Sequence, residues 1–165
     1  MVRDPIPLPD EWSAAKRDAT ASQAGSLHAS LSAALRDEIF AAARAGVPNE
    51  ACGLLVSDQY AGAGGVARRY VPLRNAAESP YRYFIDPDEQ LRAWLDLDDA
   101  DEIVWAIVHS HVASDARPSQ TDVGLAFYPD SLYLICSLAD PDQPVVRAWS
   151  IRDNSVAEVS LDVDG

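Results

Sequence analysis

The chain has few of the residues that would place it in several common protein classes. It has 13 basic residues against 26 acidic ones, a formal net charge of −13. A surface of that sign repels phosphate backbones and anionic lipid, so we expect neither nucleic-acid nor membrane binding. There is no apolar run near the roughly 20 residues that a membrane helix needs. The N-terminal segment MVRDPIPLPDEW has acids and prolines where a secretory signal has basic and apolar residues, so we expect a cytoplasmic protein.

Cysteine and histidine are also scarce. Two cysteines, Cys52 and Cys136, do not make a disulfide framework. Each lies in an apolar run, which favours a buried free thiol over a metal ligand or a nucleophile. The chain has three histidines. His28 is expected to be an ordinary surface residue, whereas His109 and His111 stand together in HSHVASDARPSQTD, which is therefore the first candidate for chemistry.

What the sequence does contain is enough length and apolar content for one folded domain. The chain has 165 residues, of which 48% are hydrophobic and 24% charged, a normal globular balance. Residues 1–27 contain prolines and small polar residues with little apolar periodicity. We therefore expect a flexible N-terminal extension over residues 1–27 and a single domain over residues 28–165.

Apolar spacing predicts a mixture of helices and strands. Helices are expected from about Leu31 to Gly46 and over residues 87–102 and 119–128. The apolar face of the second helix is expected to consist of Leu91, Trp94 and Leu95. Strands are expected over residues 51–57, 66–73, 81–86, 103–108, 131–139, 144–152 and 155–163, the first two joined by a glycine-rich turn. Because the elements do not alternate strictly, we expect an α+β or mixed α/β domain around one sheet.

The apolar run at residues 103–108 leads directly into the histidine pair. Alternate residues of a strand point to the same face, so His109 and His111 would present two imidazoles side by side at the end of a buried strand. A catalytic zinc ion holds three protein ligands, which include imidazole nitrogen and carboxylate oxygen, and one water. Asp122 supplies the third ligand if the proline-containing loop turns back. This stretch therefore predicts a His, His, Asp zinc site.

Ordinary structural roles also explain these residues. Ser119 and Asp122 are spaced as a helix capping box, in which the serine oxygen accepts an amide N–H and the acid bonds back. Histidine pairs on strands are also common without a metal. Because both halves of the pattern fall in one short window after a buried strand, the metal interpretation is the better one.

A water-activating zinc site also needs a proton shuttle outside the ligand set. Most acids of this chain stand in polar runs such as DLDDADE. Glu50, in PNEACGLLV, stands between a helix end and an apolar strand, where burial would raise its pKa. The alternative is a surface acid at the end of a helix.

These residues together form a longer motif. The pattern E…H-S-H-x7-S-x2-D is spelled by Glu50, His109, Ser110, His111, Ser119 and Asp122, with no departure at any position. It resembles the motif of the JAMM (MPN-plus) zinc metallopeptidases. The segments PNEACGLL and YRYFIDPDEQLRAW also resemble the compact bacterial branch of that family, in which a hydrolase removes cysteine from the C-terminus of a ubiquitin-like sulfur carrier protein.

The resemblance implies a fold, a metal and a reaction. The fold is a single α/β domain with a curved mixed sheet flanked by helices, of the cytidine-deaminase-like kind. One zinc ion (Zn2+) per chain is held by the two histidines and Asp122. Glu50 acts as general base and then general acid, Ser119 stabilises the oxyanion, and Ser110 on the opposite strand face has a supporting role. The implied partner is a small ubiquitin-like sulfur carrier protein with a Gly-Gly C-terminus, cut after the last glycine.

Other functions stay open. Members of the family remove ubiquitin-like modifiers from lysines, although the short segments between motif elements favour a small leaving group such as cysteine. A non-catalytic interaction module of the same fold would lack the ligand set, and the complete set in this chain argues against that function. A cupin dioxygenase also uses H-x-H, but it needs a nearby glutamate and a later histidine, and here the nearest acid is Asp115.

For the favoured hydrolase, an extended substrate tail would add to a sheet edge near Arg74 and Asn75. The sequence leaves the oligomeric state open.

Overall fold

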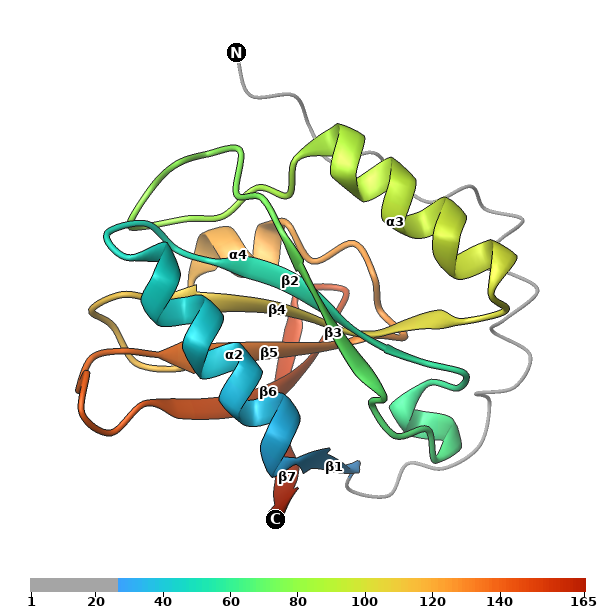
Figure 1. Ribbon diagram of the computed structural model, residues 1–165. Helices are drawn as coiled ribbons and strands as arrows, with labels where there is room; N and C mark the ends of the chain where they lie inside the picture. The colour runs from blue at the N-terminus through green and yellow to red at the C-terminus, as the bar shows by residue number, and fades with distance from the viewer. Residues whose placement is uncertain (1–26) are drawn as a thin grey trace.

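The structure is a computed structural model that describes residues 27–165 (Figure 1). The extension expected over residues 1–27 lies outside the described residues except for Leu27, so it stays a prediction. The elements follow in the order β1 (His28–Ser32), α2 (Ala33–Gly46), β2 (Cys52–Ser57), η1 (Ala61–Ala63), β3 (Arg69–Leu73), α3 (Pro87–Asp99), β4 (Ile103–His111), α4 (Gln120–Gly124), β5 (Leu132–Ser137), β6 (Val145–Arg152) and β7 (Ser155–Asp164). Among these residues, no helix combines the length and apolarity that crossing a membrane takes.

The strands form one curled mixed sheet in the order β1-β7-β6-β5-β4-β2-β3. The pairs β1–β7 and β4–β5 are parallel, and the other neighbours are antiparallel. All nine residues of β4 are buried, as its continuous apolar run predicts. The expected mixed α/β domain around one sheet is thus confirmed, and its central strand ends at His111, the second histidine of the motif.

Helices cover both faces of the sheet and bury two separate apolar clusters. Figure 1 shows α2 in front of the sheet and α4 behind it. One cluster joins α2 residues such as Leu35 and Ile39 to the sheet residues Trp105 and Leu134. The other joins α3 and the segments around α4 to the opposite sheet face, with Trp94, Leu97, Ile107, Tyr133 and Trp149 among its members. The histidine pair lies on the face of this second cluster.

The first helix begins later than the apolar spacing predicts. Residues 28–32 form β1, which pairs in parallel with β7, so Leu31 is fully buried in a strand and not in a helix. Ser32 ends the strand and caps α2, because its Oγ accepts the backbone N–H of Leu35 at 3.2 Å. The strand was missed because an apolar residue at its end also fits the helical spacing that follows.

Three further expectations are wrong in detail. The strand expected over residues 81–86 is absent from the described sheet, and the segment makes only an isolated bridge between Asn75 and Ile85. Helix α3 does form, but its buried residues are Gln90, Trp94 and Leu97, whereas Leu91 and Leu95 are more than half exposed. Helix α4 is a single short turn of the expected longer helix.

Candidate metal centre

The register of β4 places the histidines. His109 pairs with Cys52 of β2, and His111 pairs with Ser137 of β5, so both imidazoles stand on one face at the end of the sheet. Ser110 faces the other way. Its Oγ accepts the backbone N–H of Ala51 at 2.8 Å, and its own N–H donates to the Ala51 carbonyl at 2.9 Å. Ser110 therefore fixes the residue next to Glu50.

Helix α4 supplies the carboxylate. Ser119 Oγ accepts the Asp122 backbone N–H at 3.1 Å, and Asp122 Oδ2 accepts the Ser119 N–H at 2.9 Å, which is a complete capping box. The same Oδ2 lies 3.1 Å from His111 Nε2 and 3.2 Å from His109 Nε2. The capping role and the position beside the histidines thus belong to one carboxylate, and the two interpretations are compatible.

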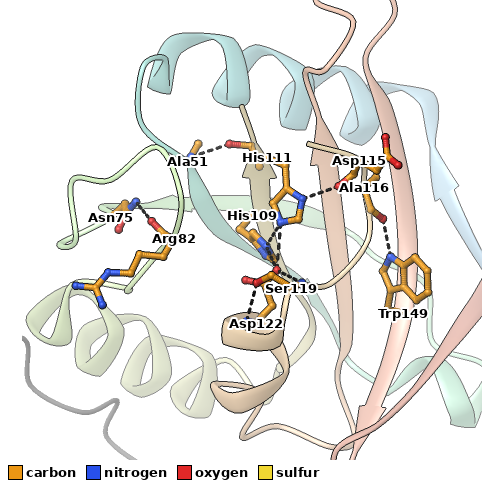
Figure 2. Close-up of polar contacts among 11 residues, drawn as sticks. Ala51, Asn75, Arg82, His109, His111, Asp115, Ala116, Ser119, Asp122 and Trp149 are labelled. Carbon is orange, nitrogen blue, oxygen red and sulfur yellow. Dashed lines mark hydrogen bonds and ion pairs between the residues drawn. The ribbon is translucent and has the colours of Figure 1, made fainter. Parts of the chain in front are cut away.

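Three potential ligand atoms converge on one point (Figure 2). The third edge of the triangle, between His109 Nε2 and His111 Nε2, is 3.2 Å. With bonds of about 2.0–2.1 Å, ligand atoms on a tetrahedral zinc ion lie about 3.3 Å apart. All three residues are at most 5% exposed. The separations, the burial and the donor set all fit a zinc ion.

The electrostatics also suit a cation. Burial alone would raise the pKa of Asp122, but hydrogen bonds from His109 and His111 outweigh it and hold the pKa well below its usual range. Burial lowers the pKa of His109, which keeps this imidazole neutral. Burial also disfavours the charged form of His111, but hydrogen bonds to Asp122 and to a backbone carbonyl raise its pKa overall. An ionised carboxylate beside a neutral imidazole is the form in which these groups bind a metal.

Two neighbours that the sequence did not indicate hold the imidazoles. The carbonyl of Asp115 accepts a hydrogen bond from His111 Nδ1 at 2.6 Å. The ring of Tyr83 stacks on His109, with centroids 4.3 Å apart and planes inclined by 21°. Among the described residues, His109 Nδ1 is buried and has no hydrogen-bond partner. No sequence motif indicates a contact made by a backbone carbonyl or by a stacked ring, so these two neighbours could not be predicted from the sequence.

Glu50 interacts electrostatically with His111 and Asp122. It is only 4% exposed, and its Oε2 has no hydrogen-bond partner among the described residues. Burial raises its pKa from 4.5 to about 8, and the charges of His111 and Asp122 also act on it, the first lowering and the second raising the pKa. The expected burial of Glu50 is observed, and the alternative of a surface acid is wrong.

Asn75 organises the segment next to Glu50. Its Nδ2 donates to the carbonyls of Glu50 and Arg82, at 2.9 and 3.1 Å, and its Oδ1 accepts the N–H groups of Ala77 and Phe84, at 3.0 and 2.9 Å. Figure 2 shows the contact with Arg82. By contrast, Arg74 is engaged with the acidic residues Glu78 and Asp86.

Comparison with known proteins decides the family. Residues 32–152 match the family described as prokaryotic homologs of the JAB domain. The chain belongs to this family. The expectation of a JAMM/MPN domain, drawn from the E…H-S-H-x7-S-x2-D motif, is therefore confirmed.

The chain is also similar to proteins with named activities. The chain is 42% identical over 135 residues to a protein of Mycobacterium tuberculosis named CysO-cysteine peptidase, covering 81% of this chain and 89% of the relative. It is 37% identical over 137 residues to a desampylase of Haloferax volcanii, covering 78% of this chain and 94% of the relative. A solution structure of a protein from Desulfitobacterium hafniense superposes with a TM-score of 0.73 at 38% identity, covering 82% of this chain and 92% of that one.

Proposed function

We propose that this JAB-domain protein is a zinc-dependent hydrolase acting on a small ubiquitin-like sulfur carrier protein. It cleaves the amide bond after the C-terminal Gly-Gly and releases cysteine or another amine. The observation that carries the proposal is the convergence of His109 Nε2, His111 Nε2 and Asp122 Oδ2, together with the buried carboxyl of Glu50, which interacts electrostatically with His111 and Asp122. The peptidase and desampylase names of the relatives support the substrate class.

In this proposal His109, His111 and Asp122 hold the zinc ion. When bound, zinc polarises the substrate carbonyl and lowers the pKa of water. Glu50 takes the water proton and later delivers it to the leaving amine. A pKa of about 8 in the metal-free protein keeps this carboxyl close to the range in which it can exchange a proton at neutral pH.

The hydroxyl of Ser119 can cap helix α4 through its oxygen and stabilise the oxyanion through its proton. Its oxygen accepts the Asp122 N–H, which leaves its O–H as a donor. That proton can be directed at the developing oxyanion of the substrate while the cap stays intact. Ser119 is exposed, so a substrate has access to its hydroxyl.

The sheet edge offers a way to present the carrier tail. β3 is the last strand in the sheet order, and an extended peptide can add to such an edge through main-chain hydrogen bonds. Leu73 at the end of β3 pairs with Cys52, which in turn pairs with His109, so a tail running along β3 is directed toward the site. Glycines at the end of the tail permit close backbone approach.

We place the protein in the cytoplasm, since Cys52 and Cys136 are free and buried.

The desampylase relative favours a second candidate, an isopeptidase that removes the modifier from protein lysines. Both substrates present nearly the same carbonyl and differ in the leaving amine. The test offers the carrier linked at its Gly-Gly end to cysteine, and separately to the Nζ of a protein lysine, and follows product masses with wild type and with Glu50→Gln. Cleavage of the cysteine adduct by wild type, and not by Glu50→Gln, supports the first candidate. Cleavage restricted to the lysine adduct replaces it with the second, and cleavage of neither refutes both.

A further inference from the structure

The loop between β4 and α4, residues 112–118, is held to the sheet through three consecutive backbone carbonyls. Each accepts a hydrogen bond from a side chain of a different strand. The pairs are Ser114 with Ser137 Oγ of β5 at 2.6 Å, Asp115 with His111 Nδ1 of β4 at 2.6 Å, and Ala116 with Trp149 Nε1 of β6 at 2.9 Å. Figure 2 shows the last two contacts side by side.

The middle contact determines which nitrogen of His111 is available to a metal. A carbonyl oxygen only accepts hydrogen bonds, so the proton of the neutral imidazole is on Nδ1. Nε2 of the neutral ring therefore carries the lone pair that a metal would take, whereas the charged imidazolium has a second proton there, which it donates to Asp122 Oδ2, 3.1 Å away. If the Asp115 carbonyl moves, His111 loses both its orientation and its preference for this tautomer.

The side chain of Trp149 is held in place by burial and by two arginines. It is 3% exposed. The guanidinium of Arg117, from the loop itself, lies 5.3 Å from the Trp149 ring centroid, and that of Arg147 lies 4.8 Å from it. Arg147 is held in turn by a two-bond ion pair with Glu158. The indole thus contacts the loop through its N–H and through its ring face.

We propose that Trp149 and Ser137 are positioning residues for the metal ligand His111, acting through the carbonyls on either side of Asp115. Neither side chain makes a described contact with the three ligand atoms. They fix the loop backbone at the residues before and after the one carbonyl that orients the imidazole. The inference rests on the proposed zinc site and goes beyond it, because it assigns a contribution to zinc affinity to two residues outside the motif.

The expected effect follows from the role of such outer partners. Removing a group that orients a metal-bound histidine typically lowers metal affinity about 10–100-fold. Trp149 acts one step further away, through the backbone, so we expect Trp149→Phe to weaken zinc binding by about tenfold. Phenylalanine keeps an aromatic ring for the two arginines to contact and removes only the N–H donor and part of the ring. Ser137→Ala is expected to act in the same direction.

The chain offers a matched control in Trp105. It is fully buried, and its Nε1 donates to the Gly65 carbonyl at 2.8 Å, so Trp105→Phe removes the same kind of hydrogen bond. Trp105 belongs to the other apolar cluster, on the α2 face of the sheet. A general loss of stability will therefore appear in both tryptophan variants, whereas a loss of zinc affinity through His111 is expected only in Trp149→Phe.

The test measures zinc affinity by competition with a chromophoric chelator, and thermal unfolding of each protein without metal. The inference predicts weaker zinc binding in Trp149→Phe and Ser137→Ala, and wild-type binding in Trp105→Phe. Wild-type zinc affinity in folded Trp149→Phe and Ser137→Ala, despite lowered melting temperatures, would overturn it and leave a structural role only. If Trp149→Phe does not fold, Ser137→Ala decides alone. Absence of zinc binding by wild type would refute the proposed function itself, which separates the two failures.

Discussion

The most informative single side chain outside the motif is Asn75, whose substitution should loosen the segment beside the site. Asn75 makes four hydrogen bonds to backbone groups, including the carbonyl of Glu50 and the N–H of Phe84. The segment that it holds carries Tyr83, which stacks on His109. We therefore examine Asn75→Ala, which removes all four bonds, and Asn75→Asp, which keeps the shape and loses the two donors.

The magnitude follows from counting these bonds. A hydrogen bond within a protein contributes about 0.5–1.5 kcal/mol net, and a partner left unsatisfied in a buried place costs more. Asn75 is only partly buried, so water replaces some of the lost partners. We expect Asn75→Ala to lower the free energy of unfolding by about 2–4 kcal/mol. Asn75→Asp should lose about as much, because a carboxylate oxygen would then face the carbonyls of Glu50 and Arg82.

The assay is urea unfolding of the metal-free proteins, followed by cleavage measurements on the folded variants. Tyr81→Ala is the control, because Tyr81 lies in the same segment, is 86% exposed, and should change stability by less than about 0.5 kcal/mol. Cleavage should fall in both Asn75 variants and persist in Tyr81→Ala. An Asn75→Ala protein as stable and active as the Tyr81→Ala control would show that this hydrogen-bond network does not hold the site.

Three further predictions concern the motif. Ser110→Ala should lower the unfolding free energy by about 0.5–1.5 kcal/mol in urea, because the part-buried Ala51 N–H loses its acceptor; an unchanged value would contradict this. Because burial raises the pKa of Glu50 from 4.5 to about 8, the folded metal-free protein keeps a proton that the unfolded chain releases, so stability should fall as pH rises across this window. The same pH series in Glu50→Gln should be flatter, and identical slopes would refute the assignment. Asp122→Ala should cost the metal-free protein about 1 kcal/mol of unfolding free energy, because the Ser119 N–H loses its carboxylate acceptor, and an unfolding curve identical to that of wild type would contradict this.

Much of the central architecture is predictable because its signals are local. The continuous apolar run at residues 103–108 predicts a strand that is buried on both faces, and all nine residues of β4 are buried. The two histidines follow it with period two, so their shared face is a consequence of strand geometry. The spacing of Ser119 and Asp122 predicts a capping box as well as a ligand, and both features occur together.

What sequence patterns missed depends on contacts between distant segments. β1 exists because residues 28–32 pair with β7 at the other end of the chain. The segment around Tyr83 has the composition of a strand, but the side chain of Asn75 bonds to the Arg82 carbonyl and the Phe84 N–H, two backbone groups that a strand partner would use. Trp149 reaches the 112–118 loop from β6, across more than thirty residues. Local propensity carries no information on such pairs.

The central claim, a zinc ion held by His109, His111 and Asp122, is tested most directly by elemental analysis of the purified protein. Wild type and Asp122→Ala are prepared identically in chelator-free buffer, and zinc per folded chain is measured in each. The account predicts one zinc per chain in wild type and almost none in Asp122→Ala. A zinc-free wild type, or an Asp122→Ala protein that retains one zinc, would contradict it.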